Sequence, residues 1–231
     1  IPHHEEISMT INLESSVGQI ATEHPLATRV FARHGIDFCC GGGRALGAIC
    51  SERGMEGDAV LAEIEKELVE PGSGQVRWDQ APLGDLVTHI VAVYHRPLDE
   101  ELPRLESMAR KVFEVHGDKQ PEALRELLSV FVGLKAELED HMQKEEQILF
   151  PMIKCGEGDM ADGPISVMEH EHENAGNALR RIRELTNGYQ VPEEACNTWR
   201  ALWHGLHALE LSLHQHIHLE NNILFPRALA G

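Results

Sequence analysis

Two stretches of the sequence share the pattern H-x-x-x-E-x-x-I-L-F-P. They read HMQKEEQILFP at 141–151 and HIHLENNILFP at 216–226. Because an α-helix places residues i and i+4 on one face, His141 with Glu145 and His216 with Glu220 each present an imidazole beside a carboxylate. Imidazole and carboxylate groups together are ligands of first-row transition metals. The repeated pattern therefore indicates metal-binding chemistry.

Both His–Glu pairs lie in stripes of apolar residues at helical spacing, which predicts that they face a core. The stripes are Leu134, Leu138, His141, Glu145, Leu149 and Met152 in one helix and Leu206, Leu209, Leu213, His216, Glu220 and Ile223 in the other. A single pair of this kind is usually a solvated helix face. A buried carboxylate is very costly without a partner, however, and four-helix bundles commonly compensate it with metal ions. Two pairs in a duplicated context therefore favour a metal site.

The same test selects one histidine from each of two further helices. His172 falls on the apolar face of its helix, and His95 falls on that of the other more closely than His89 does. His95 precedes His141 by 46 residues, and His172 precedes His216 by 44. The sequence thus predicts two similar helical hairpins, each supplying one His and then a His-x-x-x-Glu pair. Four His and two Glu exceed the ligand set of one zinc ion and suit two first-row metals bridged by carboxylates.

Four long helical patterns hold these residues, and strand-like alternation is absent from the sequence. The patterns cover about 82–116, 121–153, 164–187 and 192–227, with glycine- and proline-containing loops between them. Long helices joined by short loops predict an all-α fold with an up-down-up-down four-helix bundle. Pro97 and Pro103 predict a bend in the first helix rather than a break. The prolines that close the two ILFP segments predict the ends of the second and fourth helices.

A shorter helical unit precedes the bundle. The segment EPGSGQ at 70–75 has the composition of a linker and divides the chain into domains at 1–70 and 76–231. Before it, PLATRVFARHG at 25–35 has an early proline and a closing Gly35, as one helix would. The run DAVLAEIEKELVE at 58–70 predicts a second helix, with Asp58 as its N-cap.

Cys39 and Cys40 are adjacent in the segment DFCCGGG. Neighbouring cysteines cannot form a disulfide without a strained backbone, while backbone donors of the following glycines can lower a thiol pKa. The pair is therefore either a functional site, for redox chemistry or for transient binding of iron, a persulfide or nitric oxide, or a small turn in which the thiols pack as apolar groups. The residues alone favour neither.

The overall composition narrows the function classes. The chain has 38 acidic and 20 basic residues and a formal net charge of −18, which argues against nucleic acid and anionic membranes as partners. It contains neither an apolar run of about 18 residues, as a membrane span requires, nor the pattern of a signal peptide. Its five cysteines do not form the framework of a small secreted domain. These features predict a cytoplasmic protein.

From about residue 10 onward, the chain resembles the ScdA-type iron–sulfur cluster repair di-iron proteins, which join a small N-terminal domain to a hemerythrin-like domain. The resemblance is carried by GIDFCCGGG, HMQKEEQILFPMIK, GPISVMEHEHE and HIHLENNILFPRALAG. It implies two iron ions, bridged by an oxo group and by two glutamates, and it places the paired cysteines of the family at Cys39 and Cys40. The di-iron ligands implied by the resemblance are His95, His141, Glu145, His172, His216 and Glu220.

The resemblance further implies a stress protein that restores iron–sulfur clusters damaged by nitric oxide or peroxide. Repair could proceed by donation of iron, by binding and reduction of nitric oxide, or by both, with Cys39 and Cys40 transferring iron or nitric oxide. Damaged iron–sulfur proteins would be its partners, and a homodimer is expected because helical bundles with a small appended domain often dimerise. The alternative is a hemerythrin-like carrier or sensor of O₂ or nitric oxide without turnover. Iron storage is disfavoured because the Glu-x-x-His pattern of ferritin-type sites occurs only once, at Glu169 and His172.

Overall fold

The computed structural model describes residues 11–39, 41–69 and 76–231, and its contacts divide the chain into two compact units, residues 1–79 and 80–231. Within the described ranges the regular structure is helical, apart from one isolated bridge between Ser16 and Ala45. The predicted all-α class is therefore confirmed. The expected linker at 70–75 lies outside the described residues. Among the described helices, none is both long enough and apolar enough to cross a membrane.

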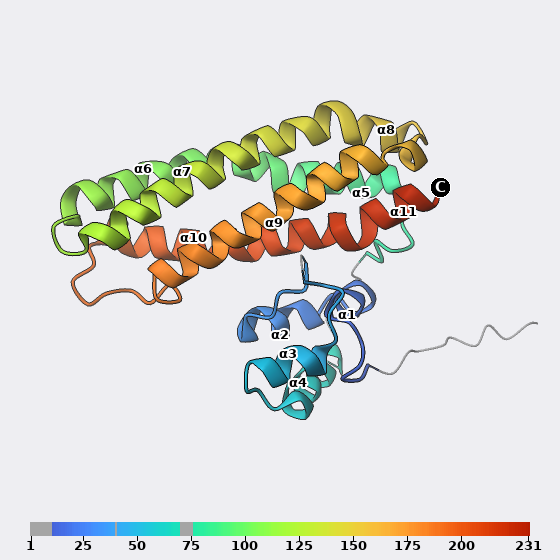
Figure 1. Cartoon of the computed structure of the whole chain (residues 1–231), viewed down its shortest axis with the longest axis horizontal. Coiled ribbons are helices and arrows are strands. Elements are labelled where there is room, and N and C mark those ends of the chain that lie inside the picture. The colour runs from blue at the N-terminus through green and yellow to red at the C-terminus, as the bar shows by residue number, and fades with distance from the viewer. Residues whose placement is uncertain (1–10, 40, 70–75) are drawn as a thin grey trace, which may run out of the picture. The chain divides into compact units, whose positions relative to one another are not determined.

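Four helical columns form the second unit (Figure 1). Three of them are runs of helical segments that follow one another without a loop, and the third in chain order is a single helix. The columns are, in chain order, α5 (Leu83–Ile90), η1 (Val91–His95) and α6 (Arg96–His116); α7 (Pro121–Lys144), η2 (Glu145–Leu149) and α8 (Phe150–Lys154); α9 (Asp162–Leu185), which follows the short 3₁₀ turn η3 (Gly158–Met160); and α10 (Asn197–Leu219), η4 (Glu220–Leu224) and α11 (Phe225–Ala230).

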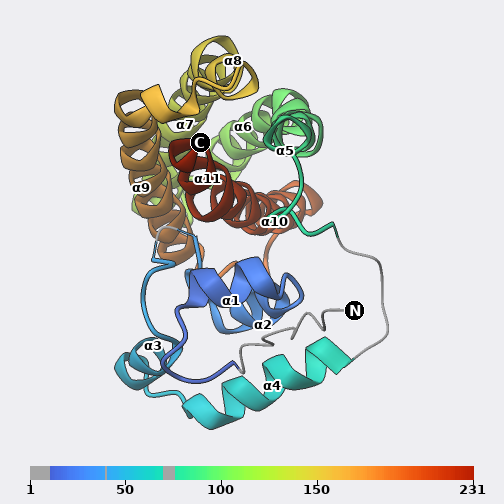
Figure 2. The ribbon, with the colours of Figure 1, turned by 90° about the vertical axis from the view of Figure 1, so that its right-hand side faces the viewer.

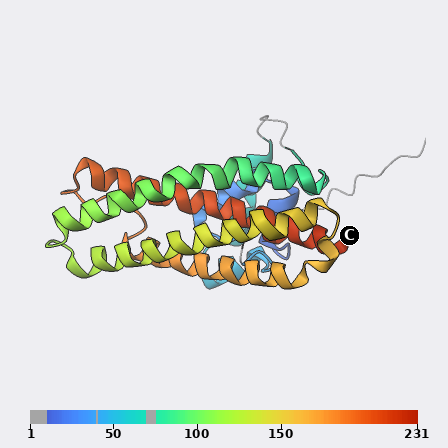
Figure 3. The same cartoon turned by 90° about the horizontal axis from the view of Figure 1, so that it is seen from above.

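These columns pack as an up-down-up-down bundle, as predicted. Helix α7 packs against α6 and α9, and α10 closes the bundle by packing against α6 and α9 (Figures 2 and 3). Apolar residues at helical spacing fill the centre, including the fully buried Phe131 and Trp199. The predicted site residues lie nearer the end where α5, α8 and α11 are found (Figure 1).

Prolines modify the columns without ending them. The first column runs unbroken from Leu83 to His116 through Pro97 and Pro103, as expected. The second and fourth columns continue past Pro151 and Pro226, so the prediction that these prolines end the helices is wrong. The reason is positional, because each proline stands in the first turn of a new α-helical segment, where a missing N–H is tolerated.

The described residues of the first unit form four helices, α1 (Val17–Glu23), α2 (Ala27–His34), α3 (Leu46–Glu52) and α4 (Gly57–Val69). Gly35 closes α2 in the left-handed conformation, with φ of 62°, which confirms its predicted role. Helix α4 begins at Gly57, so Asp58 lies in its first turn instead of capping it. Phe31 and Phe38 pack at the centre of this unit with ring centroids 5.7 Å apart.

Candidate metal centre

Six predicted side chains converge inside the bundle, and none is more than 3% exposed. They form two four-residue clusters, and both clusters contain Glu145 and Glu220. His95 and His216 complete the first cluster, whereas His141 and His172 complete the second. Within each cluster, one ligand atom from every residue lies within 4.8 Å of the others. The structure therefore brings together all six residues that the sequence selected for the metal site.

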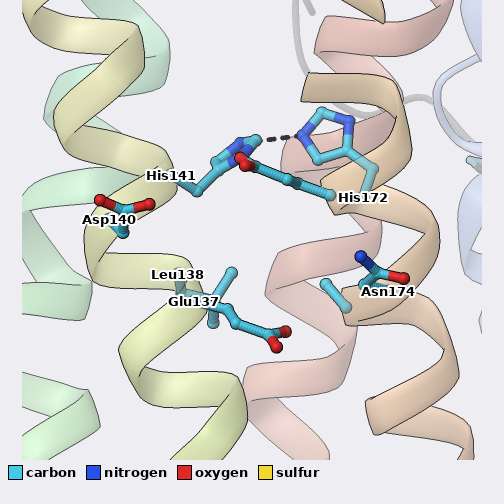
Figure 4. A pocket seen from close by; sticks show the side chains of 8 residues that line it. Glu137, Leu138, Asp140, His141, His172 and Asn174 are labelled. Carbon is cyan, nitrogen blue, oxygen red and sulfur yellow. Dashed lines mark hydrogen bonds and ion pairs between the residues drawn. The ribbon is translucent and has the colours of Figure 1, made fainter. Parts of the chain in front are cut away.

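Each cluster combines one histidine from each helical hairpin. The Nε2 atoms of His95 and His216 are 3.1 Å apart, and those of His141 and His172 are 3.0 Å apart (Figure 4 for the second pair). A hairpin thus contributes half of each cluster instead of one complete cluster. The two HxxxE patterns are equivalent halves of a single paired site.

Outer hydrogen bonds fix the orientation of three imidazole rings. His95 Nδ1 lies 3.0 Å from Glu146 Oε1, and His141 Nδ1 lies 2.9 Å from Glu171 Oε2. His172 Nδ1 lies 2.7 Å from Asn221 Oδ1. Because these oxygens are acceptors, each Nδ1 carries the proton and donates it outward, which leaves the Nε2 lone pair directed at the centre.

The fourth ring is held by stacking. Within the described chain, His216 Nδ1 has no hydrogen-bond partner, and the ring lies nearly parallel to that of Tyr94, with centroids 5.3 Å apart and an interplanar angle of 10°. Phe150 similarly stacks on His95, and Phe225 stacks on His172, with interplanar angles of 23° and 4°. Aromatic packing therefore limits the rotation of the His95, His172 and His216 rings.

Several carboxylate oxygens at the centre accept no hydrogen bond from the described residues, although histidines lie beside them. Glu145 Oε2 is 3.4 Å from Nε2 of both His95 and His141, and Glu220 Oε2 is 3.2 Å from His172 Nε2. In the described part of the chain, neither oxygen of Glu145 accepts a hydrogen bond, and Glu220 Oε2 accepts none. Paired Nε2 lone pairs and buried carboxylates both carry a large free-energy cost unless a cation lies between them. One cation in each cluster would satisfy both. The donor set therefore fits a metal-binding site.

Charge–charge interactions dominate the protonation of the metal-free site. Burial lowers the pKa of His141, but the carboxylates of Glu145 and Glu220 outweigh burial and raise that pKa to about 9. Burial raises the pKa of Glu220, but His216 and His172 outweigh it and hold that pKa well below its usual value. The site therefore retains ionised carboxylates, and they raise the pKa of His95 and His141, which favours protons on these two imidazoles. Metal ions must compete with these protons.

Each cluster also has one outer carboxylate. Glu146 serves the first cluster and pairs with Arg96, whereas Glu171 serves the second and lies 2.5 Å from Lys144 Nζ. Together with Glu145 and Glu220, these residues place four carboxylates around the two clusters. Their four negative charges would balance the four positive charges of two divalent ions, although Arg96 and Lys144 offset part of the negative charge.

Sequence reasoning based on i, i+4 pairs missed the outer residues Glu146, Glu171 and Asn221 and the stacking residue Tyr94. Each is the immediate neighbour in sequence of a predicted site residue. The duplication extends to two of them, because Glu146 and Asn221 each directly follow a site glutamate. Each one accepts a hydrogen bond from the histidine on the other helical column of the same hairpin, Glu146 from His95 and Asn221 from His172. This adjacency is a signal that the sequence contained.

Comparison with known proteins places this site in a family. Residues 86–228 match the hemerythrin HHE cation binding domain, and residues 13–68 match the ScdA_N domain, a domain of unknown function. The iron–sulfur cluster repair protein YtfE of Pectobacterium atrosepticum is 45% identical over 220 residues, covering 94% of this chain and 98% of the relative. YtfE of Yersinia pseudotuberculosis is 46% identical over 216 residues, covering 94% and 97%. The chain belongs to the YtfE family.

Membership of the YtfE family confirms the resemblance inferred from the sequence motifs. The hemerythrin HHE match contains all six converging residues, from His95 to Glu220. Together with the buried His/Glu clusters, this match identifies the bundle as a metal-binding domain.

In this YtfE-family chain, one cleft connects the surface with the second cluster (Figure 4). The cleft has a volume of about 210 Å³ and reaches His141 and His172 between α7 and α9. Its polar lining includes Glu137, Asp140 and Glu171. A small cation or molecule therefore has a polar, acidic approach to the second cluster.

The predicted cysteine pair is described only in part, because Cys40 lies outside the described residues. Cys39 is buried, its backbone N–H donates to Asp37 Oδ1 at 3.0 Å, and its Sγ lies 3.2 Å from the same oxygen. The thiol thus has a polar neighbour in its own segment. This geometry is compatible with both a functional and a packing role.

Proposed function

We propose that this chain is a di-iron protein that repairs iron–sulfur clusters damaged by nitrosative or oxidative stress. The observation that carries the proposal is the presence of Glu145 and Glu220 in both buried clusters, since two shared carboxylates are what a bridged pair of metals requires. In this proposal, His95 and His216 hold one iron and His141 and His172 hold the other. The curated YtfE relatives are named for the same repair function.

The donor set supports iron that can be released. Two carboxylates and four neutral imidazoles leave part of the charge of two divalent ions uncompensated at the centre, with Glu146 and Glu171 one shell further out. The acidic cleft beside Glu137 and Asp140 would favour the passage of a cation to and from the second cluster. These features suit donation of iron to a damaged client better than permanent storage.

Nitric oxide is the second expected ligand. The six residues would hold the irons, which when bound would supply labile metal and an affinity for small molecules such as nitric oxide or O₂. The chain's own residues would orient the imidazoles through their Nδ1 atoms and surround them with the rings of Tyr94, Phe150 and Phe225. Reduction of nitric oxide is part of the proposal: two irons in the ferrous state would supply the two electrons that, with two protons, convert two molecules of nitric oxide to nitrous oxide and water.

The alternative function is a hemerythrin-like carrier or sensor of O₂ or nitric oxide. It is favoured by one observation, namely that the hemerythrin HHE match alone contains the complete set of six converging residues. A carrier would have no need of Cys39 and Cys40. In the repair function, these thiols would transfer iron or nitric oxide between the site and the client.

Reactivation of a damaged client separates the two functions. The client is a [4Fe–4S] dehydratase inactivated by nitric oxide, mixed anaerobically with iron-loaded wild-type protein, with Glu145→Ala/Glu220→Ala or with Cys39→Ser/Cys40→Ser. Cys155→Ser is the control, because Cys155 is an exposed thiol in the other unit. Repair predicts reactivation by the wild type and the control, loss with the glutamate variant and a marked decrease with the double cysteine variant. Reversible gas binding without reactivation by the wild type would instead establish the carrier.

The proposal includes the cytoplasm as the location and a homodimer as the assembly. Fractionation of cells that contain the tagged full chain tests the location. Analytical ultracentrifugation tests the assembly, and a mass near 26 kDa at micromolar concentration would contradict the dimer, since one chain is 25.8 kDa.

A further inference from the structure

Three of the four columns contain a five-residue π-helical segment, and each segment includes a residue of the site. His95 is the last residue of η1, Glu145 is the first of η2, and Glu220 is the first of η4. A π segment is wider than an α-helix because its N–H groups donate to the carbonyl five residues earlier, and such segments are rare. The donors that close the segments confirm this spacing: Arg96 donates to Val91, Phe150 to Glu145 and Phe225 to Glu220.

A proline follows each π segment at the same place. Pro97, Pro151 and Pro226 all stand six residues after the first residue of their segment. Proline has no N–H to donate to the carbonyl four residues earlier, and its ring clashes with that carbonyl in a regular α-helix. Helix α9, which supplies His172, is an ordinary α-helix throughout Asp162–Leu185 and has no proline after Pro164. Pro103 stands inside α6, and the residues directly before it are α-helical, so a proline alone does not widen a helix.

The π segment advances the inward face of the column by one residue. After Glu145, a straight α-helix would direct Ile148 and Met152 inward, but Ile148 is 54% exposed and Ile153 is buried instead. The fourth column differs at the residue equivalent to Ile148, because Ile223 is buried. Beyond the π segment it shows the same advance, since Ala228 is buried and Arg227 is only partly so. This advance carries the two phenylalanines inward, where Phe150 stacks on His95 and Phe225 stacks on His172.

Two of these columns could easily lose the π geometry. The helical segments beyond η2 and η4 are short, with five residues in α8 and six in α11. Rotating such a short end by one residue would restore regular α-helical hydrogen bonds and would move only a few buried side chains, namely Phe150 and Ile153 in α8 and Phe225 and Ala228 in α11. A feature that blocks this rearrangement is therefore needed at residues 151 and 226.

We propose that Pro151 and Pro226 are positioning residues for the metal centre, because they prevent η2 and η4 from reverting to regular α-helix. They thereby keep Glu145 and Glu220 in place and hold the two phenylalanine rings against the histidines. Pro97 has the same relation to η1. This inference rests on the proposed metal function of the six residues.

The inference predicts that metal affinity falls while the stability of the metal-free protein changes little. Alanine has the higher helix propensity, but proline is tolerated in the first turn of a helix and restricts the unfolded chain. These opposing effects should keep the unfolding temperature of Pro151→Ala/Pro226→Ala close to that of the wild type. Loss of the π geometry would displace the glutamates and weaken metal binding by about tenfold or more, as disturbed supporting residues do in other metal sites. A merely structural role of the prolines would lower stability and leave the intrinsic metal affinity unchanged.

The test uses the full chain with Co²⁺ as the probe, because Co²⁺ reports its coordination by visible absorption whatever the native metal is. The titration compares the wild type with Pro151→Ala, Pro226→Ala, the double variant and the control Pro103→Ala. The melting temperature of each metal-free protein is also measured. Hydrogen exchange over residues 145–151 and 220–226 reports the helix type independently of any metal. We expect a loss of Co²⁺ affinity of at least about tenfold in the double variant, a melting temperature close to that of the wild type, and wild-type affinity in Pro103→Ala.

Two results would overturn the inference. One is a double variant that binds Co²⁺ as tightly as the wild type, and the other is an equal loss of affinity in Pro103→Ala. Failure of the proposed function is distinct, because it would appear in the wild type as the absence of bound iron or of client reactivation. The wild type decides the function, and the ratio of variant to wild type decides the role of the prolines.

Discussion

The Nε2 atoms of His141 and His172 lie 3.0 Å apart in the bundle, while their Nδ1 atoms face Glu171 and Asn221 on the opposite sides of the rings. When both imidazole rings are uncharged and no metal is bound, their Nε2 lone pairs would therefore point at each other in a buried space. A proton on one ring or a metal ion between the rings removes this repulsion. The site therefore couples protons and metal, and the stability of the protein depends on which is present.

The metal-free protein should lose stability as the pH rises from about 6.5 to about 9. Burial lowers the pKa of His141, but the nearby carboxylates of Glu145 and Glu220 raise it to about 9 in the folded state, above the ordinary histidine value of 6.5. A raised pKa means that the folded protein holds a proton more tightly than the unfolded chain, so this contribution is complete below about 6.5 and is lost above about 9. Urea unfolding of chelator-treated protein at several pH values measures it. A free energy of unfolding that stays constant or rises over this range would contradict the prediction.

Removal of the outer carboxylate Glu146 should weaken metal binding without unfolding the bundle. Glu146 accepts the Nδ1 proton of His95, and loss of such a support typically costs about 10–100-fold in metal affinity. Glu146→Gln should lose less than Glu146→Ala, because an amide oxygen can still accept that proton, as Asn221 does for His172. Chelator competition measures the affinity, and Glu139→Ala is the control from the exposed side of the adjoining helix. Equal affinities for Glu146→Ala and Glu139→Ala would show that the outer hydrogen bond has no role.

A buried ion pair should stabilise the bundle away from the metal site. Arg183 binds both oxygens of Glu210, which is only 2% exposed. Arg183→Met leaves this carboxylate buried without its partner, and we expect a loss of about 2 kcal/mol, below the full cost of a buried pair because the arginine side chain is 35% exposed.

Urea unfolding checks the ion-pair prediction with two further variants. Arg183→Met/Glu210→Leu should recover most of the loss, since no charge remains buried. Arg181 lies on the same helix as Arg183 and forms an exposed ion pair with Glu126. The free energy of unfolding of Arg181→Met should differ from that of the wild type by less than about 0.5 kcal/mol. A loss in Arg181→Met as large as that in Arg183→Met would contradict the expected importance of burial.

The sequence predicted the main features of the bundle because they follow from short-range periodicity. Apolar spacing located four columns, and the i, i+4 rule placed His141 beside Glu145 and His216 beside Glu220. The pairing of His95 with His216 across the hairpins could not be obtained in this way, because it depends on how the columns pack. The approach of the two hairpins determines it.

Local departures from the α-helix were the other features that periodicity could not provide. A stripe at α-helical spacing places Met152 on the inward face, but the π segment at Glu145–Leu149 advances that face, and Ile153 is buried instead. Pro151 was expected to end the helix, yet it begins a further turn. A proline placed six residues after the start of a widened segment is recognised only when the hydrogen bonds are known.

Metal content per chain tests the central claim most directly. Iron and zinc would be measured in three anaerobically purified proteins: the wild type, Glu145→Ala/Glu220→Ala and the control Glu139→Ala/Glu173→Ala. The two glutamates of the control are exposed, one on α7 and one on α9. The shared glutamates predict two irons per chain in the wild type and the control, and loss of both in the Glu145/Glu220 variant. A single zinc in the wild type, or iron that survives removal of both shared glutamates, would contradict the account.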